Sequence, residues 1–266
     1  MRCLLTIILL ATSVAGFASD FRPFDGPKPI VVLIESNPWA MVIGTDTPQF
    51  VLYDTREALF FGRGGCYRHQ LSEREFQDVM TRVTAVTRGG PIKRFIDLAP
   101  DITDQPSADL YLDGGGKRVA TRVYGISTRG HPAGPYTVMS RGSKADKLPK
   151  ELGSLYEFLH DLNYPHSQHW VPKHIEVMIW PYEYAPDASI HWPKDWPSID
   201  SERAIKHGDM YSIYLDSTLL PQLQRFLRTR KETGAVEVGG KKWAAGWRYV
   251  FPSEPIWRKA LERARP

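Results

Sequence analysis

The stretch LYLDGGGKRVATRVY, residues 110–124, decides the fold class of this chain. An apolar run leads into three consecutive glycines, and from residue 118 onward the side chains alternate in character. A period of two is typical of a strand with one face on a core and the other toward solvent. The residues expected to face inward are Val119, Thr121 and Val123. The stretch therefore predicts an antiparallel hairpin that packs on one side.

Similar signals recur on both sides of this hairpin. Strands are expected at 30–34, 41–43, 50–53, 58–61, 175–180, 211–215, 236–238 and 243–251. Helices are expected at 73–86, where Ser72 and Glu75 form a capping box, and at 148–162, 219–227 and 255–263. Hairpins mixed with helices predict an α+β fold: mainly antiparallel β-sheet built from hairpins, with about three to four helices packed on it, on one side. Since no linker interrupts the pattern, residues 19–266 are expected to form a single domain.

Three of the strands end alike, in a tyrosine or leucine followed by aspartate, at residues 50–54, 109–113 and 212–216. Two of these units also continue through a loop into a helix. The pattern fits a degenerate internal repeat of ββα type. It equally fits strands of similar composition that each meet a turn aspartate.

The first 18 residues, MRCLLTIILLATSVAGFA, have the composition of a secretory signal peptide. Arg2 precedes an apolar run, and small residues near Ala15 and Ala18 fit cleavage after either position. The apolar run is shorter than the roughly 20 residues needed to span a bilayer. We therefore expect a protein without a membrane span, exported to a periplasm or out of the cell.

Composition excludes disorder and favours certain partners. Hydrophobic residues make up 42% of the chain and aromatic residues 12%, which is typical of a globular protein. The net charge of +4 favours an anionic partner such as a cell-envelope polymer or an acidic protein. Nucleic acid is not an expected partner, because we expect the chain to be exported and it has no recognised nucleic-acid-binding motif.

The stretch GGCYRH, residues 64–69, leaves three roles open for Cys66. Cys3 lies in the expected signal peptide, so Cys66 would be the only thiol of the mature protein. It could be a nucleophile with His69 as its base, or a disulfide link between two copies of the chain. It could also be a buried structural thiol at the end of a hairpin, which we favour because no third catalytic group or cysteine-hydrolase signature accompanies it.

Histidines gather between residues 166 and 191. If the chain made one turn there, His166 and His169 could share a metal ion. Against this, no HExxH motif is present, and Pro165 and Pro172 limit any helix. Histidines in a surface loop are the favoured interpretation, and we expect no metal or other cofactor.

The segment 181–209 is long, has little periodicity and contains the stretch WPKDWP. Long irregular segments within compact domains are commonly functional, and aromatic residues on them suit binding. The candidate binding residues are Tyr182, Tyr184, His191, Trp192 and Trp196. The alternative is that the tryptophans cover a core.

These patterns favour an exported, non-catalytic binding protein that recognises a protein or an envelope polymer through segment 181–209, such as an immunity-type inhibitor of a toxin. The alternative is a secreted hydrolase that uses Cys66 and His69, or a metal held by the histidines of 166–191. The chain has no GxSxG, SxxK or CxxC motif. The oligomeric state does not follow from the sequence.

Overall fold

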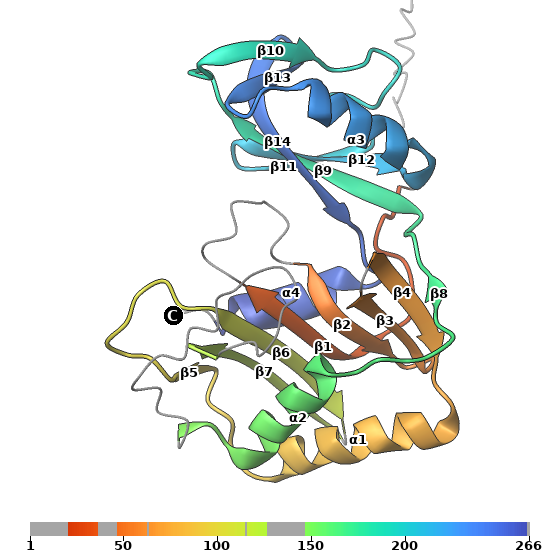
Figure 1. Cartoon of the computed structure of the whole chain (residues 1–266), viewed down its shortest axis with the longest axis vertical. Coiled ribbons are helices and arrows are strands. Elements are labelled where there is room, and N and C mark those ends of the chain that lie inside the picture. Colours follow the sequence, from red (N-terminus) through yellow and green to blue (C-terminus); the bar gives the residue numbers. More distant parts are fainter. Residues whose placement is uncertain (1–20, 37–46, 63, 115, 127–146, 265–266) are drawn as a thin grey trace, which may run out of the picture.

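A computed structural model describes residues 21–36, 47–62, 64–114, 116–126 and 147–264. The expected signal peptide, the expected strand at 41–43 and most of the polar loop after residue 125 lie outside the described residues. Within these ranges the chain has four α-helices and 14 strands, and the strands form two mostly antiparallel sheets (Figure 1). The α+β class and the hairpin-built sheets are thereby confirmed, although the strands form two sheets rather than one.

The first sheet, sheet A, has the strand order β5-β7-β6-β1-β2-β3-β4-β8. Its strands are β1 (Pro29–Ser36), β2 (Pro48–Tyr53), β3 (Glu57–Gly62), β4 (Gly65–Gln70), β5 (Phe95–Asp97), β6 (Ser107–Gly114), β7 (Lys117–Tyr124) and β8 (Gln168–His169). The hairpin at 110–124 is the pair β6 and β7. Val119, Thr121 and Val123 are buried, as their alternation predicts.

Two helices cover one face of sheet A: α1 (Glu73–Arg88) and α2 (Lys150–His160). The capping box of α1 is present, because Ser72 accepts from the Glu75 N–H and the Glu75 carboxylate accepts from the Ser72 N–H. Helix α1 packs tightly on β6. A Cβ atom added to Gly114 would lie 2.7 Å from Cγ1 of Val83, which explains the glycine at the end of that strand.

The opposite face of sheet A is covered by α4 (Glu254–Glu262), near the end of the chain. Figure 1 shows α1 and α2 on one side of sheet A and α4 on the other. Trp257 is fully buried there against β-strand side chains that include Val32, Val51 and Tyr111. The expectation that the helices lie on one side is therefore wrong. The strands of this sheet carry apolar residues on both faces, so each face needs cover.

The second sheet, sheet B, has the order β10-β13-β14-β9-β12-β11. Its strands are β9 (His174–Pro181), β10 (Asp187–His191), β11 (Ala204–His207), β12 (Met210–Asp216), β13 (Gly234–Val238) and β14 (Lys241–Tyr249). One face packs against α3 (Leu220–Thr229) through a core that includes Ile175, Val177 and Leu223. The turn before α3 is capped by Asp216, whose Oδ1 accepts from the N–H and O–H of Thr218.

Candidate functional site

The structure places Cys66 and His69 on opposite faces of β4. Cys66 is 1% exposed and packs in the core between sheet A and α4. His69 stacks on Tyr164 on the other side, with 4.5 Å between the ring centroids. Residues three positions apart on a strand point in opposite directions. The strand therefore does not bring the thiol and the imidazole together.

We expect Cys66 to react slowly with thiol reagents in the folded protein. Burial raises the pKa of its thiol to about 12, so little reactive thiolate forms at neutral pH. In a chain carrying Cys3→Ser, a chromogenic disulfide reagent should label Cys66 about 100-fold more slowly in buffer than in denaturant, because access requires local opening. Labelling at the same rate in both conditions would favour an exposed thiol and a disulfide to a second copy.

The predicted metal residues lie at the surface of sheet A. His169 in β8 pairs with Tyr67, and their ring centroids are 4.5 Å apart. His166 is exposed and has a φ of 66°. Among the residues that the structure describes, no three His, Cys, Asp or Glu side chains gather in a group that could hold a metal ion.

The two tryptophans of WPKDWP lie in the core of sheet B. Trp192 and Trp196 are each 8% exposed and make edge-on contacts with each other and with Phe226 of α3. Any binding role of segment 181–209 therefore falls to its surface residues. Tyr184 is 96% exposed, and His191 is exposed beside Glu237, 3.0 Å away. Tyr182 is half-buried.

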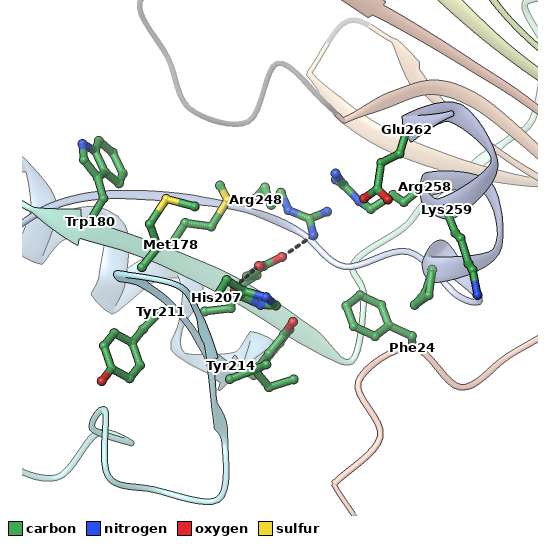
Figure 2. Close-up of a pocket in the computed structure, with 15 residues that line it drawn as sticks. Phe24, Met178, Trp180, His207, Tyr211, Tyr214, Arg248, Arg258, Lys259 and Glu262 are labelled. Carbon is green, nitrogen blue, oxygen red and sulfur yellow. Dashed lines mark hydrogen bonds and ion pairs between the residues drawn. The ribbon is translucent and has the colours of Figure 1, made fainter. Parts of the chain in front are cut away.

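A pocket of about 920 Å³ opens on the face of sheet B that α3 leaves uncovered. Figure 2 shows its lining, with the strands of sheet B on one side and α4 on the other. Its lining residues are Phe24, Glu176, Met178, Trp180, Ile205, His207, Met210, Tyr211, Ser212, Tyr214, Arg248, Pro255, Arg258, Lys259 and Glu262. Ile205 and His207 belong to segment 181–209, so part of that segment does reach the pocket.

The end of the pocket farther from α4 is apolar. Cross-strand partners share a face of the sheet, so Met178 of β9 lies in one row with Ser212 of β12 and Gly246 of β14. Ile205 continues this row on β11 as the partner of Ser212. Gly246 carries no side chain, so nothing projects from β14 at this point of the row. Met210, on the same face, is 51% exposed at the entrance.

The end near α4 is charged and buried. Arg248 of β14 forms an ion pair with Glu176 of β9 and donates to Glu254 of α4 at 2.6 Å. Ser212 donates to Glu176, and Arg258 donates to Glu254. Arg248, Glu176 and Glu254 are all buried. The ion pairs thus join the open face of sheet B to the helix that covers sheet A.

Burial and neighbouring charges set the protonation states of the groups in this network. Burial alone would lower the pKa of Arg248, but attraction by Glu254 and Glu176 raises it above its ordinary value, so the guanidinium stays charged. Burial, followed by the charge of Glu176, raises the pKa of Tyr214, so its phenol stays neutral. Near α4 the pocket is therefore lined by the charged guanidinium of Arg248 and the neutral phenol of Tyr214.

The N-terminal segment forms a third wall of the pocket. Phe24 meets Tyr214 edge-on, with 5.9 Å between the ring centroids. Its carbonyl accepts from the N–H of Ser253 at 2.6 Å, and the carbonyl of Gly26 accepts from the Ser253 hydroxyl at 3.1 Å. The approach is close, since a Cβ atom on Gly26 would lie 2.4 Å from Cβ of Pro252. The wall is fixed directly to the start of α4.

The chemistry of the pocket suits binding. The Ser212 hydroxyl donates to Glu176, and this carboxylate is already paired with Arg248, so it is a poor base for activating the hydroxyl.

Comparison with protein-family models, curated proteins and solved structures finds no match. The function is therefore argued from the pocket itself. No helix in the described part of the chain is long and apolar enough to cross a membrane.

The sequence contained two signals of this pocket that periodicity alone did not reveal. In β9, the residues that face away from the core of sheet B are Glu176, Met178 and Trp180. A charged residue followed by two large apolar ones is unusual for a strand face in contact with solvent. Glu254 and Arg258 are four residues apart on a helix, a spacing typical of an ion pair. Neither signal specifies a pocket until sheet B and α4 are placed against each other.

Proposed function

We propose that this chain is an exported, non-catalytic binding protein whose ligand site is the pocket between sheet B and α4. The observation that carries the proposal is a pocket of about 920 Å³ with an apolar end and a charged end. Ligand sites in proteins commonly have this size and combine apolar walls with a few placed polar groups. The preferred ligand is an amphipathic component of the cell envelope.

The lining of the apolar end indicates what the larger part of this ligand is made of. Trp180, Met178 and Met210 line it, and the aromatic and thioether groups adapt to acyl chains or flat rings. Burying apolar surface there stabilises the complex by about 25 cal/mol per Å² removed from water. An apolar body is therefore the main source of affinity.

The lining near α4 indicates the charge of the ligand's head group. Lys259 brings a cation to the lining, as does Arg258, which is already paired with Glu254, and Glu262 of the same helix is also part of the lining. The positive net charge of the chain attracts anions over longer distances. We therefore assign an anionic head group to the ligand.

A hydrolase has less support. Cys66 and His69 lie on opposite faces of β4. His169 lies in β8 and His166 in the turn before it, and the described residues contain no group of three side chains that could hold a metal. None of these side chains lines the pocket. A protein or polymer partner is compatible with the pocket if it presents an amphipathic group of the kind described.

Met210→Asp should weaken binding of a long-chain fatty acid about tenfold, which corresponds to about 1.4 kcal/mol. The new carboxylate would stand at the apolar end of the pocket, where an acyl chain that packed against it would remove water from the charge. Displacement of a fluorescent anionic naphthalene sulfonate by dodecanoate measures the change.

Val171→Asp is the matched control, because Val171 is an equally exposed apolar residue that does not line the pocket. It should bind as the unchanged protein does. Equal affinities for all three proteins, or no binding by any of them, would rule out this ligand class.

A further inference from the structure

Three soft donor groups line the apolar end of the same pocket: the thioethers of Met178 and Met210 and the imidazole of His207. They come from three adjacent strands in the order β9, β12 and β11. The register puts them close together. His207 and Met210 are direct cross-strand partners, and Met178 faces Ser212, two residues along β12 from Met210.

Sheet geometry sets the spacing of these groups. Direct cross-strand partners have Cβ atoms about 4.5–5.5 Å apart, and diagonal neighbours lie about 7–8 Å apart. A methionine side chain has three rotatable bonds before its methyl group, so it adjusts to such separations. Met210 is therefore a close neighbour of both Met178 and His207. Met178 and His207 stand on either side of β12, so the side chain of Met210 would be the central ligand between them.

The surroundings select the kind of cation. Thioether and imidazole ligands suit soft cations, and thioethers in particular select Cu(I). Hard cations need several oxygen ligands, and the neighbours of these groups are Trp180, Ile205 and Ser212, whose single hydroxyl already donates to Glu176. The face of an indole also attracts a cation that lies over it. Met210 and His207 are exposed, so an ion can reach them from solvent.

We propose that Met178, Met210 and His207 form a binding site for Cu(I), with Trp180 beside the ion. Ag(I), which has the same preference for thioethers and no redox chemistry in water, is its analogue. The site shares Met178, Met210 and Trp180 with the pocket of the proposed function, but Cu(I) binding depends on the sulfur and nitrogen donors and not on apolar volume. Figure 2 shows Met178, Trp180 and His207 within the lining.

The test is an anaerobic titration with Cu(I) in competition with bicinchoninate. The protein carries Cys3→Ser and Cys66→Ala, because thiolates bind Cu(I) more tightly than thioethers do. We expect one equivalent of Cu(I) to bind and X-ray absorption to show sulfur ligands. Met178→Leu, Met210→Leu and His207→Gln should each weaken binding at least tenfold, and the two leucine substitutions together should abolish it.

Matched controls separate this site from general effects. Met80→Leu, on α1, and His191→Gln, on β10, should leave Cu(I) binding unchanged, since neither residue lines the pocket. Undiminished binding by the double leucine variant, ligation by nitrogen and oxygen alone, or absence of Cu(I) binding would each overturn the proposal. Fatty-acid binding by the protein with unchanged pocket residues is measured separately, so the outcome for Cu(I) does not decide the proposed function.

Discussion

Glu254→Gln should lower the free energy of unfolding by about 3–5 kcal/mol, the usual cost of removing one partner from a buried ion pair. Glu254 is fully buried and is shared by Arg248 of β14 and Arg258 of α4. Its second oxygen accepts from the N–H of Phe251 at 3.3 Å. Glutamine keeps the shape but not the charge, so Arg248 would stay buried with Glu176 as its remaining carboxylate partner in the network.

Urea denaturation followed by far-UV circular dichroism measures this loss. Glu262→Gln is the matched control, since Glu262 is an exposed carboxylate on the same helix, and its effect should lie within about 0.5 kcal/mol of zero. Equal stability of the two variants would mean that the buried carboxylate contributes no more than a surface charge. The Glu254 variant should also bind fatty acid more weakly, because α4 forms a wall of the pocket.

Trp257→Ala should cost about 3–5 kcal/mol, the range measured for removing a large aromatic side chain from a core. Trp257 is fully buried between α4 and sheet A. Its indole N–H has no hydrogen-bond partner among the described residues, so the loss comes from packing. For the same reason Trp257→Phe should cost considerably less than the alanine substitution.

Thermal and urea unfolding of these variants provide the measurement. Ile256→Ala changes the neighbouring residue on the exposed side of α4 and should cost less than about 1 kcal/mol. If Trp257→Ala were as mild as Ile256→Ala, α4 would not be held to sheet A by this side chain. The ion pairs of Glu254 would then be the main attachment of the helix.

Local patterns predicted the individual elements of the fold well. The capping box at Ser72 and Glu75 marks the start of α1, and the alternation in 118–124 gives the facing of β7, because both depend on residues close in sequence. Short elements were missed. β4 was not among the expected strands, although Cys66 was placed at the end of a hairpin, because the residues of β4 alternate only weakly in polarity.

The arrangement of the elements could not be predicted in the same way. The segment 181–209 reads as irregular, yet it contains β10 and β11, whose four or five residues are too few to show a period. Trp192 and Trp196 resemble surface aromatics until α3 is placed over them. The pocket depends on partners far apart in the chain, such as Phe24 and Arg258. Such juxtapositions leave no periodic trace in a single sequence.

The place of α4 in the chain has a consequence for the order of folding. The strands of sheet A are made early, but the helix that covers one of their faces comes after the whole of sheet B. Until it docks, apolar side chains such as Val32, Val51 and Leu59 lack that cover, and an exposed face of this kind favours aggregation. Contacts that span so much of the chain also slow folding. The yield of folded protein therefore depends on how long sheet A stays uncovered on one face before α4 docks.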